Sequence, residues 1–222
     1  MEELKIVTLL REGSLYLGVL TAIIATITFH KYKNSFLKYI LYFLWYVAIN
    51  EFIGLIVKTY SEDRHNSIVY NIYGIVSLVF FLSIYRHFIQ KKKFKKYISF
   101  FIVSCVVLYI VSAFFIDYMK NILTIAYLYG SIALAISIVF YFIETLNSER
   151  ILVISKDILF WISIGLFIFQ MGIIPFMIIR EYYIEFVLLE LNIILLLYYV
   201  LIYVLNICYI TGFIWGQKLL NE

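Results

Sequence analysis

The chain has 222 residues, of which 64% are hydrophobic and 14% are charged, and its formal net charge is +4. Soluble domains carry about twice that share of charged residues, so the composition excludes a water-soluble globular protein. It also argues against nucleic-acid binding, because the chain has too few polar residues to build a folded basic surface.

Seven apolar runs divide the chain. They cover residues 15–30, 36–57, 67–88, 97–116, 121–143, 158–179 and 183–213. Each run is long enough to cross a bilayer, and only a helix satisfies the backbone polar groups of such a run in hydrocarbon. The sequence therefore predicts an all-α membrane protein, with residues 1–222 forming a single domain of seven transmembrane helices.

Basic residues are shared unequally between the two ends of the predicted bundle. Six lie on the side that holds the N-terminus and twelve on the other side, which accounts for all 18 Lys and Arg residues. Loops rich in Lys and Arg stay in the cytoplasm. We therefore expect the N-terminus outside and the C-terminus in the cytoplasm, in a bacterial inner membrane.

Polar side chains inside the predicted spans gather in the outer half, about 6 to 13 Å from the outer end at 1.5 Å per residue. Such groups are costly in a membrane and often mark function. They predict an outward-facing pocket for a small or cationic ligand, lined by Asn50, Glu51, Asn71, Gln170 and Asn192. The alternative is that these groups form interhelical hydrogen bonds and bind no ligand.

Two further features belong to the same layer. Gly172 and Pro175 predict a kink in the sixth span, because proline removes a backbone donor and frees a carbonyl. Glu190 points about 200° away from Asn192 around the helix, so we expect it at the outer interface. The side of the seventh span that we expect to face the pocket instead contains Asn192, Leu196, Tyr199, Tyr203 and Asn206.

The chain contains 21 tyrosines and 20 phenylalanines. We interpret this abundance mainly as a compositional bias, with aromatic belts at the membrane interfaces as the alternative. No individual tyrosine is predicted to form part of a site.

Small residues recur at helical spacing in the fifth span, at Ala126, Gly130, Ala133 and Ser137. Such a stripe lets another helix approach closely. Packing within the bundle is the favoured interpretation, and a homodimer interface is the alternative.

One connection is strongly basic and contains Arg86, Lys91, Lys92, Lys93, Lys95 and Lys96. This segment fits a role in fixing topology and in attracting anionic lipid headgroups of the membrane. The alternative is a docking site for an acidic cytoplasmic protein.

Motifs for catalysis, cofactors or metals are missing from the sequence. The histidines His30, His65 and His87 are too scattered for a zinc or haem site. The seventh span contains no lysine that could anchor a retinal. We therefore expect no cofactor and no metal, and an enzyme is the least favoured class.

The stretch from Asp157 to Leu166, which contains Phe160, Trp161 and Gly165, precedes a long seventh span that ends in residues 209–215. In these features the chain resembles a group of short, uncharacterised bacterial proteins with seven membrane helices. Those proteins look like free-standing versions of the membrane sensory modules of two-component kinases. The resemblance implies packing roles for Trp161 and Gly165 and brings no catalytic residues.

Three functions remain open from the sequence. The first is a receptor-like or sensory membrane subunit that signals through a partner, such as a kinase or another membrane protein. The second is a small transporter or channel, with a homo-oligomer as its expected state, which would need polar groups through the inner half as well. The third is a scaffold or assembly subunit.

Overall fold

A computed structural model describes residues 2–60, 66–182 and 191–216. It is all-helical, and seven of its helices are long and apolar enough to cross a membrane. The helices are α1 (Glu2–Ile27), α2 (Lys38–Tyr60), α3 (Ser67–Phe88), α4 (Lys92–Phe115), α5 (Thr124–Leu146), α6 (Ile158–Tyr182) and α7 (Leu191–Trp215). Two short 3-10 helices, η1 (Phe29–Lys31) and η2 (Glu149–Lys156), lie in connections. The predicted all-helical architecture with seven apolar helices is therefore confirmed, as expected of a multi-pass membrane protein.

The bounds of the first and last helices differ from the predicted spans. The first helix begins at Glu2 and ends at Ile27, whereas the predicted span covers 15–30. The charged residues before position 15 interrupt the apolar pattern without breaking the helix, since Glu, Lys and Arg all favour helical backbone. Residues 183–190 of the predicted seventh span, with Glu190, lie outside the described residues.

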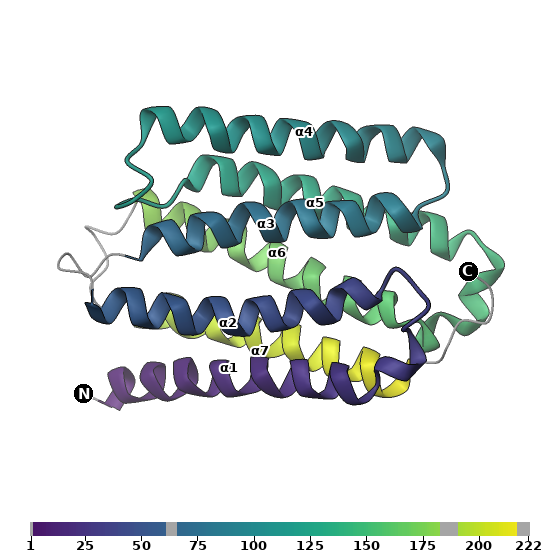
Figure 1. Cartoon of the computed structure of the whole chain (residues 1–222), viewed down its shortest axis with the longest axis horizontal. Coiled ribbons are helices and arrows are strands. Elements are labelled where there is room, and N and C mark those ends of the chain that lie inside the picture. Colours follow the sequence, from purple (N-terminus) through teal and green to yellow (C-terminus); the bar gives the residue numbers. More distant parts are fainter. Residues whose placement is uncertain (1, 61–65, 183–190, 217–222) are drawn as a thin grey trace. The chain divides into compact units, whose positions relative to one another are not determined.

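The chain divides into two compact units. Unit 1 comprises Met1–Trp45 and Leu152–Glu222, and unit 2 comprises Tyr46–Ile151. In unit 1, α7 packs against both α1 and α6. In unit 2, α3, α4 and α5 pack against one another in each pairing. Figure 1 shows how α3, α4 and α5 run side by side with alternating direction, so the start of α3, the end of α4 and the start of α5 share one end of unit 2.

Glycines allow the close approach of α6 and α7. A Cβ on Gly165 would lie 2.8 Å from Cβ of Cys208, and one on Gly212 would lie 2.9 Å from Cβ of Trp161. A Cβ on Gly172 would overlap the side chain of Leu201. Small residues let membrane helices approach closely, so these three positions fix the register of α6 on α7.

Two residues of the connection between α1 and α2 form hydrogen bonds, one with α1 and the other with α7. Lys31 Nζ donates to the backbone oxygens of Phe213 (3.1 Å) and Ile214 (2.7 Å) near the end of α7. The Tyr32 hydroxyl donates to the Ala25 oxygen at 2.5 Å, and its ring packs on Phe213 with centroids 5.5 Å apart. Burial raises the pKa of the Tyr32 phenol well above its usual value, so the phenol remains a donor.

Candidate functional site

Glu51 lies on α2 in unit 2 and is partly buried. The Tyr70 hydroxyl on α3 is 3.5 Å from Glu51 Oε2, at the long limit of a hydrogen bond. Gly54, one turn after Glu51, lies close to the same hydroxyl, since a Cβ there would be in ordinary contact with it at 3.4 Å. A carboxylate with one long hydrogen bond in an apolar helix keeps most of its capacity to bind a cation or a donor.

Further tyrosines of unit 2 surround this pair. The rings of Tyr46 and Tyr73 stack with centroids 6.3 Å apart and an interplanar angle of 19°. Tyr73 follows Tyr70 by one turn on α3, and Tyr109 and Tyr127 lie against Gly74, the residue after Tyr73. We call Tyr46, Tyr70, Tyr73, Tyr109 and Tyr127 the tyrosine cluster.

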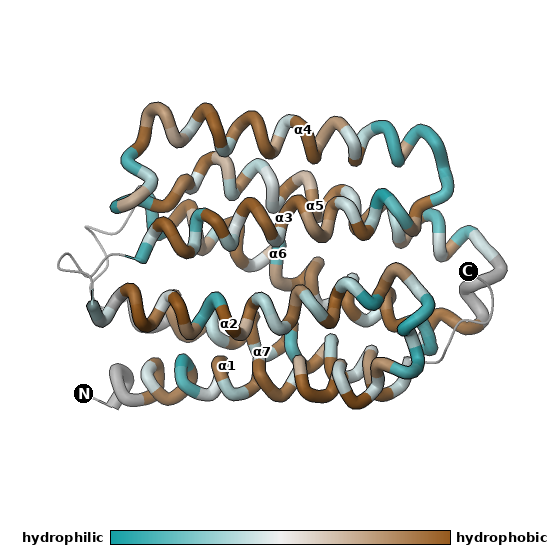
Figure 2. Tube along the Cα trace, viewed as in Figure 1, coloured by the Kyte–Doolittle hydropathy of each residue, from teal (hydrophilic) through white to brown (hydrophobic). Residues whose placement is uncertain are grey.

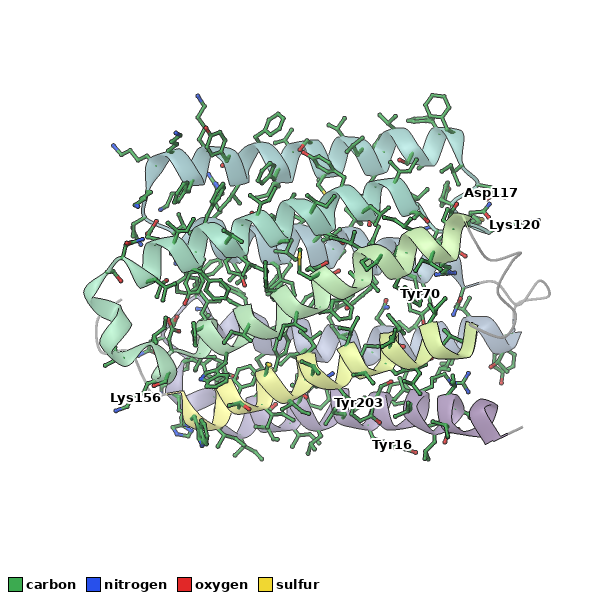
Figure 3. The ribbon with its side chains drawn as sticks, turned by 180° about the vertical axis from the view of Figure 1, so that it is seen from behind. Tyr16, Tyr70, Asp117, Lys120, Lys156 and Tyr203 are labelled. Carbon is green, nitrogen blue, oxygen red and sulfur yellow. The ribbon has the colours of Figure 1, made fainter. Side chains whose placement is uncertain are left out.

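Gly74 on α3 lets two members of the tyrosine cluster approach the backbone. A Cβ at this position would lie 2.7 Å from the Tyr109 hydroxyl and 3.3 Å from a ring carbon of Tyr127. The cluster therefore draws on α2, α3, α4 and α5, and its member Tyr70 brings a phenol hydroxyl to the Glu51 carboxylate. Figure 3 shows Tyr70 toward the same end of unit 2 as Asp117 and Lys120, which mark the turn between α4 and α5.

Asn71 has a different role from the one predicted. Its Nδ2 donates to the backbone oxygens of Tyr118 and Asn121, both at 2.9 Å, and its Oδ1 accepts from the backbone nitrogen of Leu123 at 2.9 Å. Both donors of the amide are used, and the side chain is 7% exposed. Asn71 therefore clamps the turn between α4 and α5 and has no free donor for a ligand.

The other predicted pocket residues are divided between the units. Asn50 in unit 2 is 6% exposed, and its Nδ2 has no hydrogen-bond partner among the described residues. Gln170 in unit 1 is 4% exposed, and its Oε1 likewise has none within the described ranges. Asn192 also belongs to unit 1, but its side chain is not described. Asn50, Glu51 and Asn71 thus share unit 2, whereas Gln170 and Asn192 belong to unit 1.

The predicted face of α7 packs on α1. Thr21 Oγ1 donates to Asn206 Oδ1 at 2.8 Å, and Asn206 Nδ2 donates to the Ile202 oxygen at 2.9 Å. The Tyr203 hydroxyl reaches the Leu10 oxygen at 3.4 Å, passing over Gly13, where a Cβ would overlap it. Asn206 and Tyr203 of α7 therefore form hydrogen bonds with α1.

The sixth helix continues through its proline. Pro175 lies inside α6, which extends from Ile158 to Tyr182. Gly172 is in contact with α7 through Leu201. The kink predicted from Gly172 and Pro175 stays a prediction. Trp161 packs on Gly212 and donates from Nε1 to the Ser155 oxygen at 2.9 Å, so both residues matched by the resemblance, Trp161 and Gly165, contribute to packing.

The small-residue stripe of α5 is buried within unit 2. Ala126 and Ser137 are 0% exposed and Ala133 is 2% exposed. A Cβ on Gly130 would lie 2.5 Å from Leu78 Cδ1 on α3 and 3.1 Å from Cys105 Sγ on α4. Because α3 and α4 already cover the stripe, it has no surface left for a second copy of the chain.

The basic connection follows α3 and begins α4. Glu144 at the end of α5 accepts from the backbone nitrogens of Gln90 (2.5 Å) and Lys91 (3.1 Å). Arg86 Nε donates to Ser99 Oγ at 2.7 Å. The backbone of this connection is thus held by a carboxylate, while the side chains of Lys91, Lys92, Lys93 and Lys96 are exposed.

Among the described residues, no group of three or more His, Cys, Asp or Glu side chains could hold a metal ion. The two cysteines, Cys105 and Cys208, are free thiols within helices. The geometry around Glu51 suits binding through charge, hydroxyl groups and aromatic rings.

Comparisons with known proteins give no family for the chain. No protein-family model, curated protein or solved structure matches it significantly.

Proposed function

We propose that this chain is a receptor-like or sensory subunit of a bacterial cytoplasmic membrane, with its N-terminus outside and its C-terminus in the cytoplasm. Its ligand is a small molecule with a cationic or amine group, which binds at Glu51 and the tyrosine cluster. The signal passes to a partner, either a kinase or another membrane subunit, because the described chain consists of membrane helices and their connections.

One observation carries the proposal. Glu51 is a carboxylate in the interior of an apolar helix, and among the described residues its hydrogen-bond donor is the Tyr70 hydroxyl at 3.5 Å. Burying a carboxylate without a strong partner is costly. A ligand cation would compensate that cost, and tyrosine rings stabilise cations through their faces. Signalling requires that the ligand bind two arrangements of the helices unequally.

The site can be tested on the purified protein in lipid nanodiscs with a panel of primary and quaternary ammonium compounds. We expect at least one compound to raise the unfolding temperature of the wild type and to lose this effect in Glu51→Gln. Glu12→Gln on α1 is the matched control, since Glu12 is exposed. Equal stabilisation of all three proteins would contradict a ligand site at Glu51.

The partner can be tested by affinity purification from the native host in mild detergent, followed by mass spectrometry. A stoichiometric kinase or other signalling protein supports the sensory subunit. A homo-oligomer alone, with flux of a cation across liposomes, would instead favour the transporter or channel, and a partner with no ligand would favour the scaffold.

The orientation has a separate test. A phosphatase active only outside the cytoplasm is fused after Lys120 or after Lys91. We expect activity for the first fusion and none for the second, because the turn at Lys120 and the basic connection lie at opposite ends of α4. The reverse pattern would overturn the orientation.

A further inference from the structure

The start of α4 carries basic side chains on one face. Lys92, Lys95, Lys96 and Ser99 follow the spacing i, i+3, i+4 and i+7, which places them on the same side of a helix. Lys92 and Lys96 are exposed and Lys95 is half-buried. In the part of the chain that the structure describes, none of these three ammonium groups has a hydrogen-bond or ion-pair partner.

Arg86, from the end of α3, joins this face. Its Nε donates to Ser99 Oγ at 2.7 Å, so the guanidinium lies beside the α4 face that carries the lysines. The two terminal nitrogens of the guanidinium remain for another acceptor. Arginine binds phosphate with this planar fork, and lysines add charge around it.

The Glu144 carboxylate does not neutralise these cations. Its oxygens accept from the backbone nitrogens of Gln90 and Lys91, just before α4 begins. Within the described ranges it forms no ion pair with Lys92, Lys95 or Lys96.

An exposed apolar stripe continues from the basic face along α4. Phe100 is 64% exposed, Val103 is 63% exposed and Val107 is 51% exposed. With Lys92 and Lys96 these residues follow the spacing 4-4-3-4, so they stay on one side of the helix. Figure 2 shows the hydrophilic start of α4 followed by a mainly hydrophobic helix.

We propose that this face of unit 2 binds one anionic phospholipid. The phosphate lies between Arg86, Lys92 and Lys96, and an acyl chain lies along Phe100, Val103 and Val107. Arg86 and Lys92 supply charge complementary to the headgroup, while the apolar stripe fits a chain that continues from the phosphate into the bilayer. Free phosphate would use only the first of these features, and an acidic soluble protein would not reach the second.

The test measures lipid binding to the wild-type protein by native mass spectrometry, with phosphatidylglycerol and phosphatidylcholine compared at equal concentration. We expect phosphatidylglycerol to bind preferentially. The variant Arg86→Gln/Lys96→Gln should weaken that binding about 30-fold, since each basic group near an anionic headgroup contributes roughly fivefold. The control is Lys91→Gln/Lys93→Gln, which removes the same charge from the flanks of the stripe.

Each outcome decides the proposal. Equal loss in both double variants would show diffuse charge attraction and overturn the site, as would equal binding of the two lipids by the wild type. Competition by glycerol phosphate as strong as by the intact lipid would overturn the role of the apolar stripe. Unchanged size and unfolding temperature of the Arg86→Gln/Lys96→Gln variant show that a loss of lipid is not a loss of fold.

Discussion

Replacing the buried Asn71 of α3 by alanine should destabilise unit 2 at the turn between α4 and α5. The change removes three hydrogen bonds of 2.9 Å and leaves the buried backbone nitrogen of Leu123 without its acceptor. Interhelical hydrogen bonds in membranes contribute about 0.6 kcal/mol each, and an abandoned buried donor costs about 1–3 kcal/mol. Two lost donor bonds and one abandoned donor together lead us to expect that Asn71→Ala lowers the free energy of unfolding by about 2–4 kcal/mol.

The measurement is reversible unfolding of the protein in mixed micelles titrated with a denaturing detergent. Asn121→Ala is the control in the same turn, because the Asn121 side chain makes only an exposed contact of 3.4 Å with the Asp117 oxygen. That variant should change stability by less than about 0.5 kcal/mol, the usual range for a surface position. Asn71→Asp keeps an acceptor for the Leu123 nitrogen but turns a carboxylate oxygen toward the carbonyl oxygens of Tyr118 and Asn121, so it should cost at least as much as Asn71→Ala.

A loss below about 0.5 kcal/mol in Asn71→Ala would refute this reasoning. It would show that water replaces the amide at the turn at no cost, and it would return Asn71 to the set of possible ligand-binding residues. A loss as large in Asn121→Ala would mean that the whole turn is unstable, without a special role for Asn71.

Three further substitutions probe the packing, each by the same unfolding measurement. Gly130→Ala should cost about 1–3 kcal/mol by overpacking against Leu78, whereas Gly18→Ala, with nothing within 4 Å of the added carbon, should be neutral or slightly stabilising. Lys31→Gln should cost about 0.3–2 kcal/mol by removing a cation from the C-terminal end of α7, and an equal cost in the exposed Lys33→Gln would contradict that explanation. Thr21→Val should cost about 0.6–1.7 kcal/mol by breaking the contact with Asn206, against little change in Thr211→Val, whose hydroxyl only bonds within α7.

Much of the helical architecture could be predicted from the sequence, because a run of apolar residues that crosses a bilayer has few alternatives to helix. The start of α1 was harder to place, since Arg11 and Glu12 interrupt the hydrophobic pattern while remaining compatible with helix. The small-residue stripe around Gly130 could be recognised from spacing alone.

The candidate site was less predictable. Depth in the membrane placed Glu51 and Asn71 in one predicted pocket, but depth gives no hydrogen-bond partner. The structure shows that the Asn71 amide is fully used by the turn between α4 and α5, and the pocket at Glu51 stays a prediction. The tyrosine cluster was missed because 21 tyrosines make each one uninformative by itself. The available signal was Gly74, where a missing side chain admits the Tyr109 hydroxyl, and that signal requires knowing which helices are neighbours.

The division of the chain has a consequence for the order in which the protein assembles. Unit 2 is continuous in sequence, whereas the two parts of unit 1 are separated by all of unit 2. During synthesis α3, α4 and α5 can associate as soon as they enter the membrane. The two acceptors of Lys31, by contrast, lie 182 and 183 residues further along the chain. Until α7 has been made, α1 lacks its main helical neighbour, so we expect insertion machinery or lipid to shelter α1 through most of translation.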